Sequence, residues 1–135
     1  MSESVLRCRI STDLDHLRCL IRTQARHGGL RGPRLEDLVL AANEAISNVL
    51  EHGGAGGTLT VRCVSTGVTV EVADAAGLLT PAHLAGAKLD LTGSRGFGLW
   101  IIQHLCDEVG LEQAAGGSVL TMRMDPSRHV SRALD

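Results

Sequence analysis

One stretch of the chain, from Leu35 to His52, constrains the fold more than any other part of the sequence. It reads LEDLVLAANEAISNVLEH, and its apolar residues recur at the spacing of one helical face. The apolar positions are Leu35, Leu38, Val39, Ala42, Ile46, Val49 and Leu50. This pattern predicts a long amphipathic helix that packs one side against a hydrophobic core.

The same stretch carries polar residues nearly opposite its apolar stripe. Glu44 and Asn48 are four residues apart, so they lie one above the other on a helix. A polar stripe of this kind is most often a solvated outer face. A carboxylate and a carboxamide one turn apart also suit a ligand site, because the first can act as a general base and the second as an uncharged oxygen ligand for Mg2+. The helix alone leaves both interpretations open.

Size and composition limit the classes of protein to consider. The 135 residues suffice for one domain, and we expect a single domain over residues 1–125 and a flexible tail over 126–135. One Trp, one Phe, no Tyr and a net charge of -2 argue against nucleic-acid binding. No CxxC pair indicates zinc, no apolar window is long enough to span a bilayer, and no signal core precedes the first strand. We expect a soluble cytoplasmic protein.

Periodicity elsewhere in the chain predicts the remaining elements. Alternation of apolar and polar residues predicts strands over Val5–Ile10, Thr58–Val64, Val68–Ala73, Val109–Gln113 and Ser118–Met124. Helical spacing predicts helices from Leu14 to about His27 and from Leu99 to Leu105, with Trp100 in the core. Consecutive paired strands and alternation within each strand favour an α/β two-layer sandwich, with a mixed, mostly antiparallel sheet and helices on one face.

Three further polar or glycine-rich features fall at the ends of these elements. Asp74 ends the second strand of a predicted hairpin and is followed by Gly77. A glycine-rich stretch, residues 93–98, opens the last predicted helix, and Ser118 begins the last strand. Each feature alone is weak evidence for a binding site. The glycine-rich stretch, for example, is not supported as a dinucleotide-binding fingerprint, because no parallel βαβ unit surrounds it.

Taken in this order, the pieces resemble the ATP-binding module of the GHKL superfamily, which contains histidine kinases, gyrase-type ATPases and anti-sigma-factor serine kinases. The resemblance covers roughly Ile10 to Met124. Its most specific parts are the Glu44-x-x-x-Asn48-x-x-x-His52 pattern and the sequence RGFGL. The phrase NEAISNVLEH, the length and the absence of attached dimerisation helices are most similar to the bacterial anti-sigma-factor serine/threonine kinases.

The resemblance implies a role for individual residues. Glu44 would be the general base, and Asn48 would bind the Mg2+ that bridges the phosphates of ATP. Asp74 would accept a hydrogen bond from the adenine amino group, and Ser118, where the family usually has Thr, would place a hydroxyl near the adenine. The other nucleotide-binding residues implied by the resemblance are Gly77, Arg95, Gly96, Phe97 and Gly98.

One segment departs from the pattern of the family. The family has Asp-x-Gly-x-Gly after the strand, whereas this chain has Asp-Ala-Ala-Gly-Leu at positions 74–78. Alanine costs little where φ is negative and more where φ must be positive. The consequence for nucleotide binding depends on the backbone of this turn.

Three functions remain in view on this basis. The first is an anti-sigma factor with ATP-dependent kinase activity, which would sequester a sigma factor, phosphorylate an antagonist protein and form a homodimer. The alternative is a non-catalytic anti-sigma module that sequesters its partner with or without nucleotide. A detached histidine-kinase-like ATPase ranks third, because the chain has no phosphoacceptor helix pair. No direct contact with nucleic acid or a membrane is expected.

Overall fold

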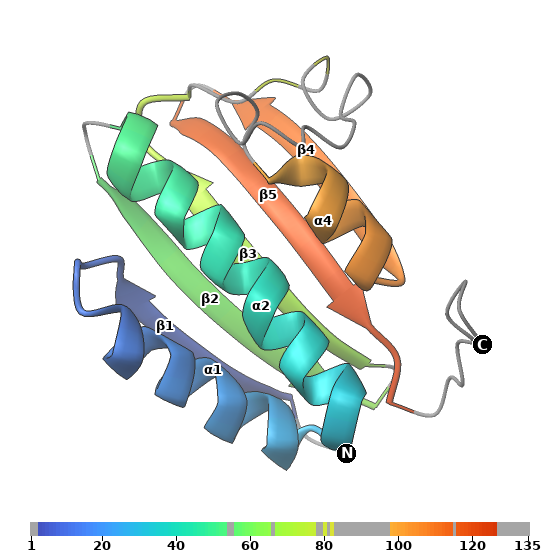
Figure 1. The fold of residues 1–135 in the computed structure, drawn as a ribbon. Coiled ribbons are helices and arrows are strands. Elements are labelled where there is room, and N and C mark those ends of the chain that lie inside the picture. Colours follow the sequence, from blue (N-terminus) through green and yellow to red (C-terminus); the bar gives the residue numbers. More distant parts are fainter. Residues whose placement is uncertain are drawn as a thin grey trace.

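The computed structural model shows an α/β fold of two layers (Figure 1). It describes residues 3–53, 56–65, 67–77, 80, 82, 98–114 and 116–126. The elements are β1 (Ser4–Arg9), α1 (Leu14–His27), α2 (Gly32–Asn48), β2 (Gly57–Val64), β3 (Gly67–Asp74), α4 (Leu99–Leu105), β4 (Glu108–Ala114) and β5 (Gly117–Met124). A π-helical turn, Val49–Gly53, continues α2. Most of the tail expected over 126–135 lies outside the described residues.

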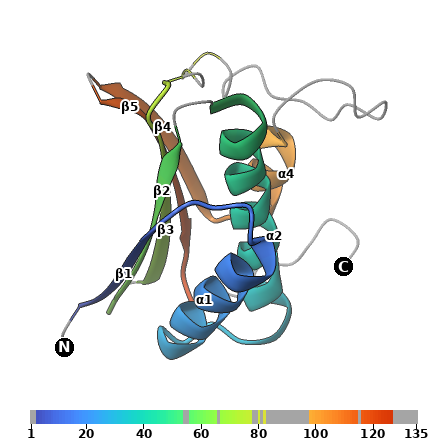
Figure 2. The same ribbon diagram turned by 90° about the vertical axis from the view of Figure 1, so that its left-hand side faces the viewer.

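The strands form a single sheet in the order β1-β2-β3-β5-β4. Every described pairing is antiparallel, so the described sheet contains no parallel pair. The predicted α/β sandwich with a mostly antiparallel sheet is confirmed. The helices lie on one side of the sheet, and the other side carries no helix among the described residues (Figure 2). No helix in the described ranges is long and apolar enough to cross a membrane.

The core lies between the sheet and the helices and is built from aliphatic side chains. Alternate residues of the central strands, such as Val70 on β3 and Met122 on β5, are completely buried. Leu38 and Ile46 of α2 and Ile21 of α1 pack against them, also completely buried. Fully burying a side chain of this size stabilises the fold by about 1.5–3 kcal/mol, so the core needs no aromatic ring.

The ends of the helices follow local sequence signals. Asp13 caps α1, because its Oδ1 accepts a hydrogen bond of 3.2 Å from the backbone N–H of His16. Pro33 lies in the first turn of α2, where its missing N–H is not needed. The predicted helix to His52 is α-helical only as far as Asn48 and ends in the π-helical turn.

One end of the molecule is held by a buried ion pair, which we call the Arg34–Asp107 clamp. Arg34, in the first turn of α2, donates from Nη2 to Asp107 Oδ2 at 2.6 Å and from Nη1 to Oδ1 at 3.2 Å. Arg34 also donates to the backbone carbonyl of Asp125 at 2.7 Å, and the Asp125 N–H donates to Asp107 Oδ2 at 2.7 Å. The clamp joins α2 to the start of β4 and the end of β5.

Candidate functional site

A buried acid and a buried hydroxyl lie side by side where β3 ends and β5 begins. Asp74 pairs with Ser118 across the two strands, and the residues are 5% and 2% exposed. The alternation that points Val72 and Leu120 into the core also points Asp74 and Ser118 toward the helices. The strand register therefore brings these two predicted site residues together on the helical side of the sheet.

The turn after β3 holds this acid in place. Asp74 Oδ1 accepts a hydrogen bond of 2.9 Å from the N–H of Ala76, and its carbonyl accepts one of 3.1 Å from the N–H of Gly77. Gly77 has a φ of +66°, and a Cβ there would lie 3.8 Å from Ser118 Oγ. No described non-glycine residue has a positive φ. Ala75 and Ala76 therefore fit this turn without backbone strain, and Gly77 takes the left-handed position.

The last turn of α2 reaches the same end of the sheet. Val49 Cγ1 lies 2.9 Å from the place a Cβ on Gly57 would occupy, and Gly57 pairs with Asp74. The neighbouring Asn48 is 8% exposed, whereas Glu51 is exposed. A wholly solvated polar stripe is therefore wrong for Asn48, because its carboxamide is buried at the end that carries Asp74.

Glu44, one turn before Asn48, contacts the start of α4. Gly98 is the N-cap of α4 and has a φ of +67°. A Cβ on Gly98 would lie 3.1 Å from Glu44 Oε1 and 3.3 Å from Glu44 Cβ, which is closer than most contacts of a Cβ. Both the backbone angle and the close approach therefore favour glycine at this position. The last residue of the glycine-rich stretch is thus packed directly against the predicted general base.

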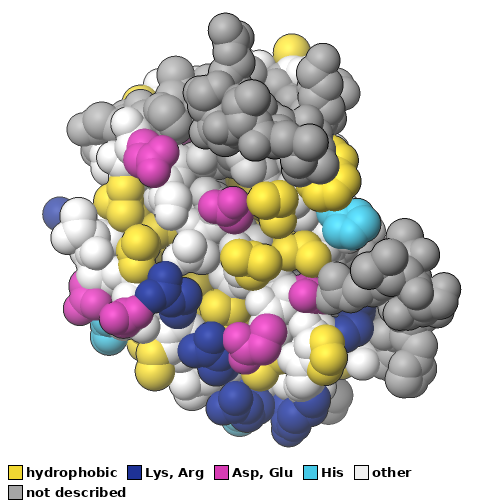
Figure 3. All heavy atoms as spheres, in the orientation of Figure 1, with side chains coloured by type: hydrophobic (Ala, Val, Ile, Leu, Met, Phe, Trp, Pro, Cys, Tyr) yellow, Lys and Arg dark blue, Asp and Glu magenta, His cyan; other side chains and the backbone are white. Residues whose placement is uncertain are grey.

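Three predicted site residues, Arg95, Gly96 and Phe97, lie outside the described residues. On the helical face, most Lys and Arg side chains lie in the lower half, away from the C-terminal turn of α2, while acidic side chains lie both among them and further up (Figure 3). The described part of the upper end therefore presents acidic rather than basic side chains on this face.

Trp100 was expected in the core, and this expectation is wrong. The residue is 36% exposed, and its ring stacks on His104 with centroids 4.9 Å apart and planes 8° from parallel. Leu99 and Ile102 are the buried residues of α4. A helix of two turns buries only one face, and an apolar run does not by itself say which face that is.

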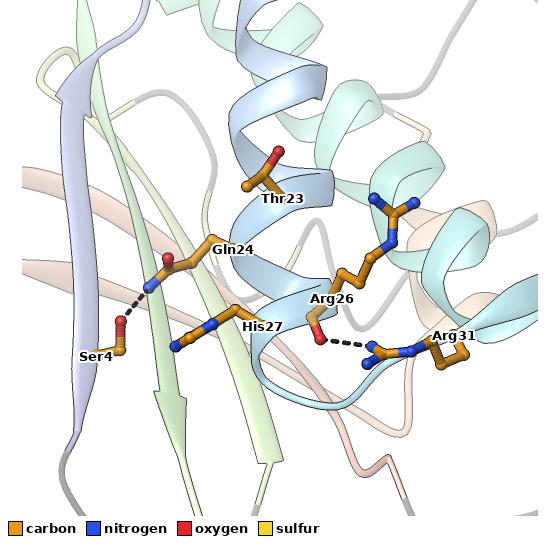
Figure 4. Close-up of a pocket in the computed structure, with 6 residues that line it drawn as sticks. All are labelled: Ser4, Thr23, Gln24, Arg26, His27 and Arg31. Carbon is orange, nitrogen blue, oxygen red and sulfur yellow. Dashed lines mark hydrogen bonds between the residues drawn. The ribbon is translucent and has the colours of Figure 1, made fainter.

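A hollow of about 460 Å3 lies elsewhere, between β1 and the C-terminal end of α1 (Figure 4). It is lined by Ser4, Thr23, Gln24, Arg26, His27 and Arg31. Gln24 Nε2 donates to Ser4 Oγ at 2.8 Å, and Arg31 Nη1 donates to the carbonyl of Arg26 at 2.5 Å. Ser4 pairs with Cys63, at the opposite end of β2 from Gly57, so the hollow is separate from the Asp74 end of the sheet.

Comparisons with known proteins bear on the family and the fold of the chain. A family profile described as the histidine kinase-like ATPase domain matches residues 10–124. A solved structure of the RsbU and RsbW domains of a Mycobacterium tuberculosis protein is similar, with a TM-score of 0.64 and 19% sequence identity over 97% of this chain. At this identity the similarity shows the fold, and the present chain covers only 34% of that chain. A search of curated proteins finds no match.

Proposed function

Because the chain belongs to the histidine kinase-like ATPase family, we propose that it binds Mg-ATP at the Asp74 end of the sheet and acts as a serine/threonine kinase and anti-sigma factor. In this proposal it is a cytoplasmic homodimer that sequesters a sigma factor and phosphorylates an antagonist protein. The carrying observation is that buried Asp74, Ser118 and Asn48 gather at one end of the two layers. The contact of Glu44 with Gly98 adds the predicted base at the start of α4.

The residues at this end fit a nucleotide and its metal. The Asp74 carboxylate and the Ser118 hydroxyl supply polar atoms for an adenine edge, and Gly77 and Gly98 lack the side chains that would keep a ligand from the backbone. The described residues include no group of three His, Cys, Asp or Glu side chains that could hold a metal. Mg2+ is usually held by one or two protein oxygens together with phosphate oxygens, so a single carboxamide such as Asn48 suits it.

The chain's own residues would divide the chemistry as follows. Mg-ATP, when bound, supplies the phosphoryl group and the metal charge that phosphoryl transfer needs. Glu44 accepts the proton of the attacking serine or threonine hydroxyl on its carboxylate. Asn48 offers an oxygen without negative charge, so it adds no repulsion to the phosphates. Asp74 selects adenine, because guanine has no amino group at the matching position and a buried carboxylate facing it would lose its partner.

The protein partners rest on less direct support. The NEAISNVLEH and RGFGL sequences resemble anti-sigma-factor kinases, and the fold is similar to a structure that includes an RsbW domain. Fold similarity raises the expectation of a function without assigning it. The kinase and anti-sigma parts are therefore tested separately from nucleotide binding.

Isothermal titration with ATP, ADP and GTP, with and without Mg2+, tests the nucleotide part. We expect Mg2+-dependent binding of ATP by the wild type, loss of the Mg2+ dependence in Asn48→Ala, and loss of the preference for adenine in Asp74→Asn. Asn43→Ala is the matched control, because Asn43 is also an amide on α2 but accepts a hydrogen bond from Arg18 at 2.9 Å. A wild type that binds no adenine nucleotide contradicts the proposal.

Incubation with Mg-ATP and the antagonist proteins of the same organism tests the kinase part, with phosphoserine and phosphothreonine measured by mass spectrometry. We expect transfer by the wild type and none by Glu44→Gln, which should still bind ATP. Binding of ATP by the wild type without transfer to any antagonist would instead support the non-catalytic module.

A further inference from the structure

The hollow between β1 and the C-terminal end of α1 is lined by side chains that can donate hydrogen bonds and by no acid (Figure 4). Three of its six lining residues are Arg or His, and the other three carry a hydroxyl or an amide. Its volume of about 460 Å3 is typical of sites for small molecules. The hollow therefore has the size and the composition of a site for a small anion.

The acids that lie near the hollow in the sequence are engaged by other arginines. Glu3 pairs with Arg62 at 3.1 Å, and Glu36 on α2 pairs with Arg22 at 2.9 Å. Among the described residues, no ion pair includes Arg31. The positive charge of Arg31 is therefore not compensated by an acid in the described part of the chain.

The guanidinium of Arg31 is already held in one orientation. Its Nη1 donates to the carbonyl of Arg26 at 2.5 Å and to the carbonyl of Leu30 at 2.8 Å. These two bonds use both hydrogens of Nη1 and leave the Nε–Nη2 edge, which can bind two oxygens of one anion side by side. The same edge of Arg22 binds the two oxygens of Glu36 at 3.0 and 2.9 Å. Because Arg31 is held beforehand, binding an anion costs its side chain little conformational freedom.

Further donors come from β1 and from the last turns of α1. Gln24 Nε2 donates to Ser4 Oγ at 2.8 Å, which leaves the hydrogen of that hydroxyl for another acceptor. The ring of His27 extends toward Ser4 (Figure 4), and an imidazole has at least one N–H donor in either protonation state. Thr23 adds a second hydroxyl to the lining. Donors from two elements and the turn after them thus surround one space.

The end of α1 repels an anion less than a bare helix end would. The last carbonyls of a helix carry partial negative charge. In α1 these carbonyls accept hydrogen bonds of 3.0 to 3.1 Å from backbone N–H groups that follow the helix. The pairs are Gln24 with Gly28, Ala25 with Leu30, and Arg26 with Gly29. The positive charge of Arg31 is added to these bonds.

We propose that this hollow binds a small organic phosphate monoester, with two phosphate oxygens on the Nε–Nη2 edge of Arg31 and the third oxygen facing His27 and Ser4. A phosphate has one oxygen more than a carboxylate, so it suits donors that approach from more than one side. The rest of the volume takes the organic part of the ligand. The hollow lies at the opposite end of β2 from Gly57, so this inference does not rest on the proposed nucleotide site.

Titration of isotope-labelled protein with glycerol phosphate at neutral pH, followed by amide NMR spectra, tests the site. We expect saturable shifts of the backbone amide signals of residues 23–31, and none at Gly77 or Ser118. Glycerate, which carries a carboxylate on a similar carbon skeleton, should bind at least about tenfold more weakly, because it has no third oxygen on its charged group.

Variants of the two principal donors show whether the edge of Arg31 or only its charge matters. Arg31→Lys keeps the charge and loses the edge, so glycerol phosphate should bind roughly 10- to 100-fold more weakly. His27→Ala should weaken binding at least about threefold. It removes no described hydrogen bond of the fold, so it remains informative if variants of Arg31 fail to fold. Arg9→Gln is the control, because it removes one exposed positive charge at the other end of β1, and its affinity should match the wild type.

Three results would overturn the proposal. The first is a wild type whose amide signals over residues 23–31 show no saturable shift up to about 20 mM glycerol phosphate, or show it only together with Gly77 and Ser118. The second is an affinity of Arg31→Lys equal to that of the wild type. The third is equal affinity for glycerate and glycerol phosphate, which would make the site one for carboxylates.

Discussion

Two buried aspartates at opposite ends of the same sheet are used in different ways. Asp107, whose side chain is 4% exposed, is held by the guanidinium of Arg34 and by the N–H of Asp125. Asp74, 5% exposed, holds the N–H of Ala76 and lies beside the hydroxyl of Ser118. One acid is neutralised by a cation of the chain itself, whereas the described neighbours of the other, the N–H of Ala76 and the hydroxyl of Ser118, are neutral.

The helix α2 connects these two ends, with Arg34 in its first turn and Asn48 in its last. At the clamp end, four hydrogen bonds join α2, Asp107 and Asp125 to one another, and only Arg34 Nε is buried without a partner among the described residues. Added hydrogen bonds of this kind make a buried ion pair tolerable. At the site end, an acid, an amide and a hydroxyl gather around glycines. The difference suggests that the clamp end serves stability and the site end serves a ligand, and each of the following measurements tests that division.

The largest expected effect is from Asp107→Asn. Removing the charge leaves the guanidinium of Arg34 without its counter-ion in a mostly buried position, where breaking an ion pair costs about 3–5 kcal/mol. We expect the free energy of unfolding in urea to fall by this order. Asp15→Asn, which affects an ion pair whose acid is 92% exposed, is the control and should change it by less than about 0.5 kcal/mol. If both variants lower the free energy of unfolding equally, the Arg34–Asp107 clamp stabilises the fold no more than an exposed ion pair does.

Asp74→Asn should lower the affinity for ATP more than the stability of the fold, the opposite of what we expect for Asp107→Asn. Losing a hydrogen bond to a charged acceptor costs about 1.5–3 kcal/mol of binding, so we expect ATP affinity to fall roughly 10- to 100-fold. The free energy of unfolding should change by less than about 1 kcal/mol, because asparagine keeps an oxygen for the N–H of Ala76. A variant that loses stability and keeps ATP affinity would show that Asp74 is structural, like Asp107.

Gly98→Ala sharpens the comparison at the contact with Glu44. The positive φ and a Cβ 3.1 Å from Glu44 Oε1 should together cost about 1–2 kcal/mol, seen either as lost stability or as weaker ATP binding. Gly110→Ala is the matched control, since its φ is ordinary and its Cβ would meet nothing within 4 Å. If both variants behave alike, the start of α4 is not held tightly against Glu44.

The thiol of Cys106, next to Asp107 of the clamp, makes the stability of the fold depend on pH in a way that can be tested. Burial, and to a smaller degree the charge of Asp107, raise the pKa of Cys106 to about 12, while Arg34 lowers it. In the unfolded chain the thiol ionises near pH 8.5. The raised pKa therefore favours the folded state fully below about pH 8.5, and this contribution is lost as pH rises toward 12, by about 1 kcal/mol at pH 9.5. Urea titrations should show a shallower alkaline loss for Cys106→Ala than for Cys19→Ala, whose thiol is exposed.

The smallest expected effect is from Ala76→Gly, which restores a glycine of the family pattern. Ala76 does not have a positive φ, so the substitution relieves no strain and should not raise ATP affinity. It should lower the free energy of unfolding by about 0.5–1 kcal/mol, because glycine gains more conformational freedom on unfolding. A clear gain in affinity would mean that the turn after Asp74 must rearrange to bind nucleotide.

Much of the fold could be predicted from local pattern. Strict alternation set the strands to within about two residues, and the caps and Pro33 set the helices, because these signals depend on neighbours in sequence. The clamp could not be predicted, since Arg34 and Asp107 are 73 residues apart and each alone is an ordinary charged residue. The need for glycine at position 57 could not be predicted either, because a Cβ there would lie 2.3 Å from the carbonyl oxygen of Ala73, on the neighbouring strand.

In the candidate site, too, local spacing could be predicted from the sequence, whereas contacts between distant segments could not. A spacing of four placed Glu44 and Asn48 on one face, but their surroundings depend on which strand and helix approach that face. The burial of Asn48 follows from the approach of the turn after α2 to β2, which the sequence does not specify. The exposure of Trp100 follows from the side on which α4 meets α2, which an apolar run leaves undetermined.

The stacking of Trp100 on His104 has a practical consequence. The chain has one tryptophan, and it lies two residues beyond Gly98, on a half-exposed surface next to an imidazole. Its fluorescence therefore reports on a single place, the start of α4. The protein thus carries an intrinsic optical probe, placed two residues from the glycine that contacts Glu44, and its emission can be followed without any label.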